Sequence, residues 1–562
     1  MTTPSPLPVT RRTALAAAAA ALAWRPSFAA NAAVSGAAGA EALHVLDRCA
    51  YGPAPGDLER VARMGVPAWL DEQLQPDRLA LPSGLQQQLA ALVTPTHTQQ
   101  ELVHRYRALE ANAKKALASV GSASVAQFAS ADKADRPKSP DMMERRELVQ
   151  LVHLEAGDAR LLQALNSPRQ LQEVMVEFWF NHFNVFDGKG LVKVLVESYE
   201  RTAIRPNALG RFRTLLGATA KHPAMLFYLD NWLSVAPGYQ PRRKAANRTL
   251  SGLNENYARE LMELHTLGVD GGYTQRDVTE LARMFTGWTL GKVNGEGPTQ
   301  GGAGDSIFGF EDDRHDNGTK DWLGHTVQPN GMGEGEYALD VLSRHPSTAR
   351  HIAYKLAQRF VADEPPQALV DRVARRFQES DGDIRAVLRT LFDSPEFRDP
   401  RYRGNKFKTP YQYVLSAVRA TGIPTTNVRP LMGTMTQLGQ PLFGCQTPDG
   451  YKDTEAAWLN PGAITQRVNF ATALASGRMP LVRLDVPGRR RGNGENAMAK
   501  EADAAQEDGA GSVAGSTPPV DVNTVLAAVG PAIGDKTRNA VTSSGPGLRA
   551  ALVLGSPDFQ RR

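Results

Sequence analysis

The stretch Ser251–Thr289, SGLNENYARELMELHTLGVDGGYTQRDVTELARMFTGWT, decides the fold, because it carries two helix signals around a glycine turn. Asn254 suits the N-cap of the first helix, since its side-chain oxygen can accept a free backbone N–H. Gly268 suits the left-handed residue just past that helix. Thr274 and Asp277 have the spacing of a capping box at the start of the second helix. The stretch therefore predicts two consecutive short helices.

The first of these helices has one polar face. At about 100° per residue this face carries the following side chains: Asn256, Arg259, Glu260 and Glu263. Its other face is apolar and includes His265 if the helix stays regular. The polar face either forms solvated i,i+4 pairs such as Arg259–Glu263 or lines an internal pocket. Both alternatives fit the pattern.

A second dense segment is Ser167–Phe186, SPRQLQEVMVEFWFNHFNVF, whose apolar residues recur at helical spacing. It predicts a buried helix with His182 as a core histidine holding one hydrogen bond. The alternative makes Asn181, His182 and Asn184 the polar groups of a pocket walled by aromatic rings. Asp230 could contribute to the same wall.

Repeated Ser-Pro and His-Pro pairs punctuate the chain, and proline is favoured at the first position of a helix. The 562 residues, 42% of them hydrophobic, therefore predict a mostly α, multi-helix globular domain with a Gly-rich loop and β-hairpin insertion. The expected divisions are a main domain (40–485), a mobile insertion or loose helix (109–138), the Gly-rich loop and hairpin (287–335), a disordered low-complexity segment (488–519) and a C-terminal helical segment that packs back (521–562).

Within the Gly-rich segment, residues 308–310 and 322–323 flank the sequence His-Asp-Asn-Gly at 315–318, and Asn-Gly favours a type I′ hairpin turn. Asp313, His315 and Asp316 form the densest group of potential ligands for a divalent metal. The same residue types are also favoured in turns for local hydrogen bonds. A metal site and plain turn chemistry both stay open.

The N-terminus has the pattern of an export signal. Paired arginines, Arg11 and Arg12, precede an apolar run from Ala14 to Trp24, which is typical of a twin-arginine signal peptide over residues 1–30. The run is shorter than the roughly 20 residues of a membrane span, and the sequence shows no other candidate span. A periplasmic or secreted protein is expected; the alternative is a cytosolic protein with a disordered Ala-rich tail.

Charge and cysteine content exclude several classes. Loss of Arg11, Arg12 and Arg25, with no acid before Glu41, lowers the formal net charge from +5 to +2. That bias is too small to indicate nucleic acid or an anionic membrane as partner. The two cysteines exclude a disulfide scaffold, and whether Cys49 and Cys445 pair stays open.

Several motifs carry a family resemblance: FWFNHFNVF, GLNENYARELMELHTLGVDGGYTQRDV, RHDNGTK, RHPSTARHIAYKLAQRFV and GQPLFGCQTPDGY. Together they resemble the bacterial domain-of-unknown-function family 1800, from about His44 to the end of the chain. The resemblance implies export, often beside a second exported protein encoded nearby. It implies no activity, cofactor or catalytic residue.

Two functions are expected from these patterns. The first is an extracytoplasmic, hydrolase-like enzyme, because carboxylate and imidazole groups are the minimum for general acid–base chemistry. Its candidate catalytic residues are Glu260, Glu263, His265, His182 and Arg259, and its candidate substrate-binding residues are Asn181, Asn184, Asn254, Asn256 and Asp230. The alternative is a non-catalytic binding or assembly protein acting with another exported partner. No P-loop, nucleophile elbow or HExxH motif is present.

Overall fold

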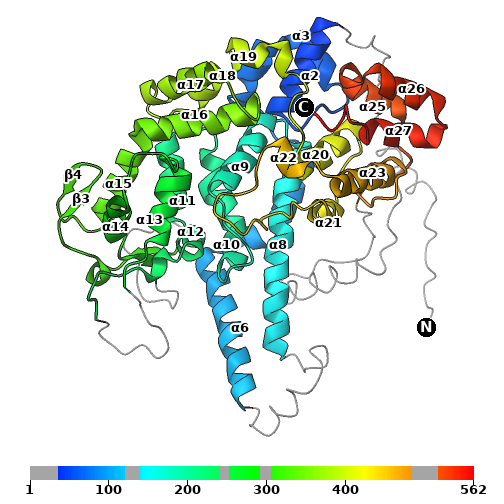
Figure 1. Ribbon diagram of the computed structural model, residues 1–562. Helices are drawn as coiled ribbons and strands as arrows, with labels where there is room; N and C mark the ends of the chain where they lie inside the picture. The colour runs from blue at the N-terminus through cyan, green and yellow to red at the C-terminus, as the bar shows by residue number, and fades with distance from the viewer. Residues whose placement is uncertain (1–35, 120–138, 241–251, 292–305, 483–516) are drawn as a thin grey trace, which may run out of the picture.

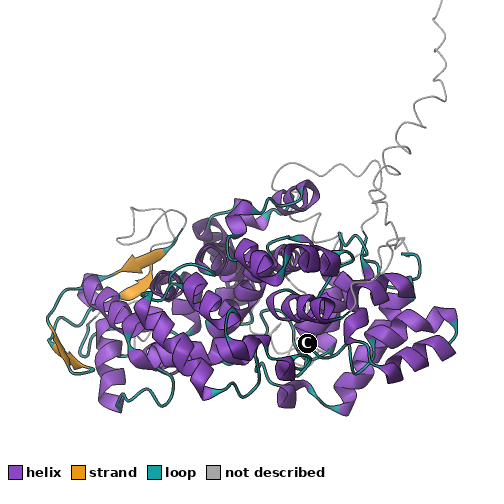
Figure 2. Cartoon of the chain, turned by 90° about the horizontal axis from the view of Figure 1, so that it is seen from above, coloured by secondary structure: helices purple, strands orange, loops and turns teal. Residues whose placement is uncertain are grey.

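The computed structural model describes residues 36–119, 139–240, 252–291, 306–482 and 517–562. Helices make up most of them, as the fold class predicted (Figures 1 and 2). Buried apolar side chains from Ala42 to Phe559 form one hydrophobic core cluster. The predicted signal segment 1–30 and most of the low-complexity segment 488–519 lie outside the described residues.

The first helices surround one long helical arm. Their bounds are α2 (Ala37–Cys49), α3 (Asp57–Met64), α4 (Val66–Gln73), α5 (Ser83–Ala90), α6 (Gln99–Ser119) and α8 (Pro140–Asn166). Helices α6 and α8 pack along each other and project from the body (Figure 1). Residues 109–119 continue α6, because Leu109 and Ala113 are buried at helical spacing. The rest of the predicted insertion, 120–138, lies outside the described part of the chain.

Helix α9 lies at the centre of the molecule (Figure 1). The bounds here are α9 (Gln170–His182), α10 (Val192–Ser198), the π-helix η3 (Tyr199–Ile204), α11 (Phe212–Lys221) and α12 (Pro223–Tyr228). Trp179 is fully buried, and its indole N–H donates to the Ala208 carbonyl at 2.9 Å. Glu173 of α9 receives two hydrogen bonds from Arg205, at 2.7 and 2.8 Å. The buried polar groups of α9 therefore fix its position against η3 and the turn after it.

Residues 252–289 contain α13 (Asn256–Glu260), the π-helix η6 (Leu261–His265) and α14 (Gln275–Met284). Gly268 has φ 84°, and the capping box of Thr274 and Asp277 is present, so both predictions are confirmed. Asn254 accepts the N–H of Asn256 at 2.9 Å. The helix does not stay regular through its last turn, and π-turns of this kind often occur at functional sites.

The Gly-rich segment forms two small antiparallel sheets rather than the predicted hairpin. Strand β1 (Trp288–Leu290) pairs with β2 (Phe308–Phe310), and β3 (Lys320–Trp322) pairs with β4 (His325–Val327). The expected pairing of residues 308–310 with 322–323 is wrong. The tight turn is Leu323-Gly324, with φ 47° and 77°, which suits a type I′ turn. Asp316 accepts the N–H of Gly318 and pairs with Arg283, which holds the Asn-Gly dipeptide against α14.

The second half is again helical: α15 (Met332–Arg344), α16 (Pro346–Phe360), α17 (Gln367–Glu379), α18 (Ile384–Phe392), α19 (Pro395–Arg398), α20 (Pro410–Thr421), α21 (Arg429–Gln437), α22 (Glu455–Trp458), α23 (Pro461–Ala475), α25 (Val522–Val529), α26 (Asp535–Ser543) and α27 (Pro546–Leu554). The C-terminal helices lie against α20 and α23. Arg562 and Lys406 exchange backbone hydrogen bonds at 2.8 and 3.2 Å. Among the described residues, no helix is both long and apolar enough to cross a membrane.

Candidate functional site

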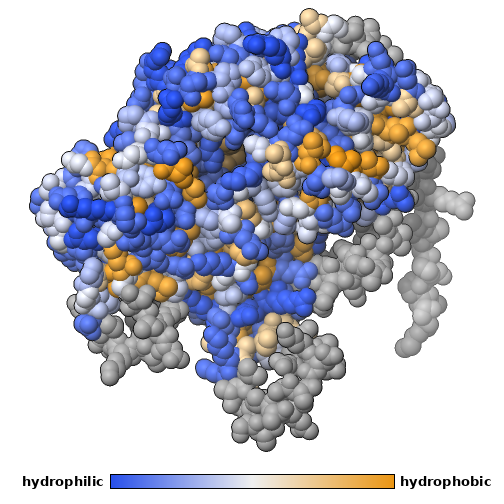
Figure 3. Space-filling model, in the orientation of Figure 1, coloured by the Kyte–Doolittle hydropathy of each residue, from blue (hydrophilic) through white to orange (hydrophobic). Residues whose placement is uncertain are grey.

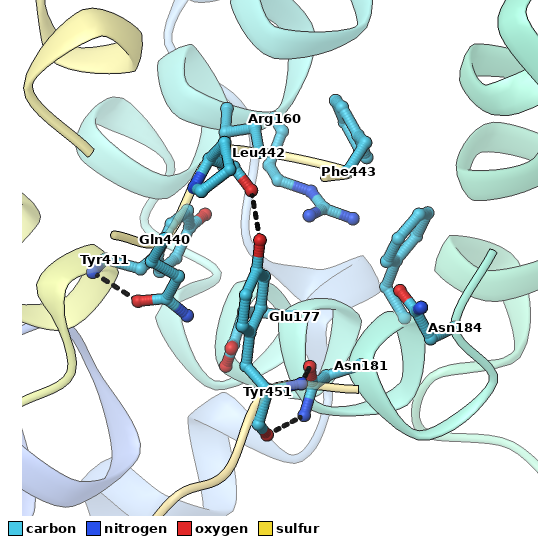
Figure 4. Close-up of a pocket in the computed structure, with 11 residues that line it drawn as sticks. Arg160, Glu177, Asn181, Asn184, Tyr411, Gln440, Leu442, Phe443 and Tyr451 are labelled. Atoms are coloured by element: carbon cyan, nitrogen blue, oxygen red, sulfur yellow. Dashed lines mark hydrogen bonds between the residues drawn. The ribbon is translucent and has the colours of Figure 1, made fainter. Parts of the chain in front are cut away.

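A cleft of about 360 Å³ opens between α9, α16 and the loop 439–454. In the space-filling view the surface is hollowed between α16 and the region of α22, with hydrophilic residues around the hollow (Figure 3). The charged and imidazole side chains that line it are Glu177, His182, His351, Lys355, Arg359, Asp449, Lys452 and Asp453. A second cavity, of about 30 Å³, adjoins the cleft behind Tyr451 (Figure 4).

Helix α16 supplies one wall of the cleft. It begins at Pro346, where the His345 side chain accepts the N–H of Ser347 as an N-cap. His351, Lys355 and Arg359 follow one another at i, i+4 and i+8, so their side chains lie along one face of the helix. All three line the cleft.

Lys355 is the charged group of the cleft that lacks a partner. Among the described residues, none forms a hydrogen bond or an ion pair with its ammonium group, although the side chain is largely buried. Burial, and secondly the charge of the nearby Lys452, lowers the pKa of Lys355 to about 8. An amine that titrates so close to neutral pH can exchange protons with a bound ligand.

His351 stands one turn before Lys355. Its Nε2 lies 3.2 Å from the Leu264 carbonyl oxygen. A carbonyl only accepts, so the ring proton is on Nε2, and within the described part of the chain no hydrogen bond involves the Nδ1 lone pair. Burial, and secondly Lys355, lowers the pKa of His351 to about 4. At neutral pH the imidazole is therefore uncharged and available as a proton acceptor.

The carboxylates of the cleft are all held in ion pairs. Glu177 lies 2.7 Å from Arg359, and Asp449 lies 2.6 Å from Lys452. Asp453 faces Arg359 at 3.5 Å and Arg562 at 3.3 Å. These pairs fix the walls of the cleft and compensate the cost of burying the carboxylates.

Two asparagines predicted as pocket residues, Asn181 on α9 and Asn184 just after its end, anchor the loop 439–454 (Figure 4). Asn181 donates to the Tyr451 carbonyl at 2.8 Å and accepts the Tyr451 N–H at 2.7 Å. Asn184 donates to the carbonyls of Cys445 and Thr447 at 3.0 and 2.8 Å. Asn181 lines both cavities and Asn184 the smaller one. Their amides position the loop, which differs from the predicted substrate-binding role.

His182 and His265 lie together beneath the cleft. His182 Nε2 is 3.1 Å from the His265 carbonyl oxygen, and the two rings are 6.1 Å apart. Burial, followed by Lys355, lowers the pKa of both histidines, that of His265 to about 3. His182 is buried with one hydrogen bond, which confirms the predicted core histidine, and it also lines the cleft, as the pocket alternative had it. His265 is a core residue behind the cleft.

The polar face of α13 follows the solvated alternative. Arg259 lies 3.3 Å from Glu263 and 3.6 Å from Glu255, with side chains that are 37%, 25% and 34% exposed. Burial, and secondly Glu263, raises the pKa of Glu260. None of Arg259, Glu260 and Glu263 lines the cleft, so the structure does not place these three candidate catalytic residues at the site.

Asp230, Asn254 and Asn256 form a separate hydrogen-bonded corner. Asp230 has φ 60° and pairs with Lys189 at 2.7 Å. Asn254 donates to the Asp230 carbonyl at 2.9 Å, and Asn256 donates to the Leu229 carbonyl at 3.4 Å. These three predicted substrate-binding residues hold the end of α12 and do not line the cleft.

The predicted metal ligands do not converge. His315 binds the Thr286 carbonyl through Nδ1 at 2.8 Å and Glu334 through Nε2 at 3.0 Å, so both ring nitrogens are used. Asp316 pairs with Arg283 at 2.8 Å, and Asp313 is exposed. Across the described ranges, no three His, Cys, Asp or Glu side chains are arranged to hold a metal. Of the two alternatives left open by the sequence, the hydrogen bonds and ion pairs of these residues fit turn chemistry. Both cysteines, Cys49 and Cys445, are buried and free.

Neither His351 and Lys355 nor the ion pairs of the cleft were predicted from the sequence. One signal was present: histidine and lysine at i and i+4 within RHPSTARHIAYKLAQRFV, on a helix with a clear His-Pro start. Periodicity alone does not distinguish this spacing from an ordinary solvated helix face.

Comparison with known proteins places the chain in a family. Residues 44–561 match the family model DUF1800, described as a protein of unknown function. No curated protein and no solved structure matches the chain. Because the match covers nearly the whole chain, this protein belongs to the DUF1800 family.

Proposed function

We propose that this protein is an exported hydrolase that cleaves an ester or amide bond in the cleft, with His351 as general base and Lys355 as general acid. The observation that carries the proposal is the placement of His351 and Lys355 one turn apart on the face of α16 that lines the cleft. Burial lowers their pKa values to about 4 and about 8. Between these values the imidazole is neutral and the amine protonated, which gives each group its role.

The proposed reaction needs one water molecule. The water oxygen attacks the carbonyl carbon of the substrate while His351 Nδ1 takes its proton. The Lys355 ammonium group stabilises the developing oxyanion and then donates a proton to the leaving alcohol or amine. Proton transfer from the His351 imidazolium back to the Lys355 amine, through water, restores both groups. The fixed ion pairs around the cleft keep the walls in place during this cycle.

A hydrolysis panel tests the proposal. Chromogenic esters, anilides, glycosides and phosphomonoesters are offered to the mature protein and to His351→Gln, whose amide can still donate to the Leu264 carbonyl. We expect hydrolysis of esters or anilides, reduced by about 10²-fold or more in the variant. His97→Gln changes a solvent-facing histidine in an ion pair with Glu101 and serves as control. Hydrolysis that survives in His351→Gln, or no hydrolysis of any acyl substrate, contradicts the proposal.

The extracytoplasmic location is part of the proposal. Its support is the pair Arg11 and Arg12 followed by the apolar run Ala14–Trp24. A second exported protein, encoded nearby, is the partner that the family resemblance suggests. Met142 and Met143 are 46% and 51% exposed at the start of α8, on the arm that projects from the body, and they offer apolar surface for such a partner.

A further inference from the structure

The charges of the cleft balance. Three carboxylates, Glu177, Asp449 and Asp453, face three cations, Lys355, Arg359 and Lys452, and burial keeps the lining histidines neutral. Strongly anionic or cationic ligands are recognised by an excess of the opposite charge, and by count this lining has none. The one lining cation without a partner among the described residues is Lys355, which the proposed function assigns to the developing oxyanion. The ligand that it complements is therefore close to neutral.

The lining is also rich in hydrogen-bonding groups. Besides the ion pairs, the cleft is lined by amide and hydroxyl side chains other than the loop-holding Asn181: Gln358, Thr409, Gln440, Tyr451 and Thr454. An ion pair at a cleft wall presents donor and acceptor atoms next to each other. A sugar hydroxyl both donates and accepts, so a ligand with many hydroxyl groups can use both kinds of partner.

Flat aromatic surface completes the cleft. Tyr354 of α16 is 41% exposed although it lines the cavity. Tyr451 lines the opposite side and packs against Trp458, with ring centroids 6.0 Å apart. An aromatic ring that faces water beside a polar cavity offers an apolar plate to the C–H face of a sugar ring. The cavity volume lies within the range of about 300–1,000 Å³ that small-molecule sites occupy.

We propose that the cleft binds a neutral carbohydrate, with one sugar ring stacked on Tyr354 and its hydroxyl groups bonded to the amides and ion pairs of the walls. Combined with the proposed function, on which this second step rests, the substrate is an acylated sugar whose ester lies against His351 and Lys355. A glycosidic bond fits less well, because its hydrolysis uses two carboxyl groups free to act as acid and base, and the carboxylates here are held in ion pairs.

Binding is tested on the mature full chain by calorimetry. The probes are short neutral oligosaccharides of glucose, xylose or N-acetylglucosamine, with a uronic-acid oligosaccharide and a short peptide for comparison. We expect a neutral oligosaccharide to bind, and Tyr354→Ala to raise its Kd by about tenfold or more. Tyr337→Ala, which removes a comparably exposed tyrosine on α15, should leave the Kd unchanged. Tyr354→Phe should bind as the wild type does, because the ring face carries the contact.

The outcomes separate this inference from the proposed function. Binding only of the uronic-acid oligosaccharide or the peptide, no binding at all, or an unchanged Kd in Tyr354→Ala overturns the carbohydrate proposal. Ester hydrolysis without sugar binding would do the same while leaving the hydrolase proposal standing. Sugar binding that persists in His351→Gln supports the inference, because the stacking contact does not depend on the acid–base pair.

Discussion

Methionine in place of Lys355 should lower turnover in the cleft by about 10²–10⁴-fold, the usual worth of a general acid, and should make the protein more stable at pH 7. The stability gain follows from the pKa, which burial lowers from 10.5 in the unfolded chain to about 8 in the folded protein. Below pH 8 the folded state carries the full cost of a desolvated ammonium group. Between pH 8 and 10.5 the folded protein releases this proton while the unfolded chain keeps it, so the cost falls as the pH rises.

The expected gain at pH 7 is about 1–2 kcal/mol after allowance for the solvent that reaches the cleft, and it should vanish above pH 10.5. Thermal unfolding at pH 7 and pH 10.5, together with kcat/KM on an ester from the panel, measures both effects. Lys536→Met removes an exposed lysine from α26 and should change neither quantity. A Lys355→Met protein that is less stable at pH 7 yet fully active would show that the lysine has a structural role.

Alanine in place of Glu334 should cost about 3–5 kcal/mol of unfolding free energy, the penalty for leaving a buried charge unpaired. The Glu334 carboxylate receives Lys320 Nζ at 2.5 Å, His315 Nε2 at 3.0 Å and the Asn330 N–H at 2.9 Å. The side chains of Glu334, Lys320 and His315 are all 0% exposed. Once the Glu334 carboxylate is removed, Lys320 and His315 lose this compensation, and residues 306–335 should become less stable.

Urea unfolding of Glu334→Ala gives the size of this loss. Asp321→Ala is the control, on β3, the strand that contains Lys320. It breaks an exposed ion pair, in which the Arg276 and Asp321 side chains are 70% and 61% exposed, and should cost about 0.5 kcal/mol or less. The double variant Lys320→Met with Glu334→Met removes both charges and should recover most of the stability. A loss below about 1 kcal/mol in Glu334→Ala would show that the buried cluster does not hold this segment.

Local signals in the sequence predicted much of the fold. The capping box of Thr274 and Asp277 and the left-handed Gly268 were read correctly, because both depend on a few neighbouring residues. The strand partners of β2 and β3 were not predicted. Arg283 of α14 and Glu334 of α15 hold the region before the Asn-Gly dipeptide, and both lie outside the expected hairpin. Pairing between distant segments leaves no periodic trace in the sequence.

The candidate site was predicted only in part. His182 was predicted to be a core histidine with one hydrogen bond, and it is buried with one hydrogen bond to the His265 carbonyl. Asn181 and His182 also line the cleft, as the pocket alternative had it. For the polar face that carries Arg259 and Glu263, the sequence left a solvated face and a pocket wall both open, because the pattern of one helix does not show which of its faces a neighbour covers. The chemistry of Lys355 was beyond prediction, because its low pKa depends on burial under α9 and the loop 439–454, far away along the chain.

The central claim is that the cleft contains a desolvated, unpaired amine at Lys355. Competitive labelling with acetic anhydride across pH, read by mass spectrometry of the peptide that contains Lys355, measures its pKa without knowledge of the substrate, since only the neutral amine reacts. The prediction is a midpoint near pH 8, well below the value of 10.5 for a lysine in an unfolded chain. A Lys355 midpoint near pH 10.5 would contradict it.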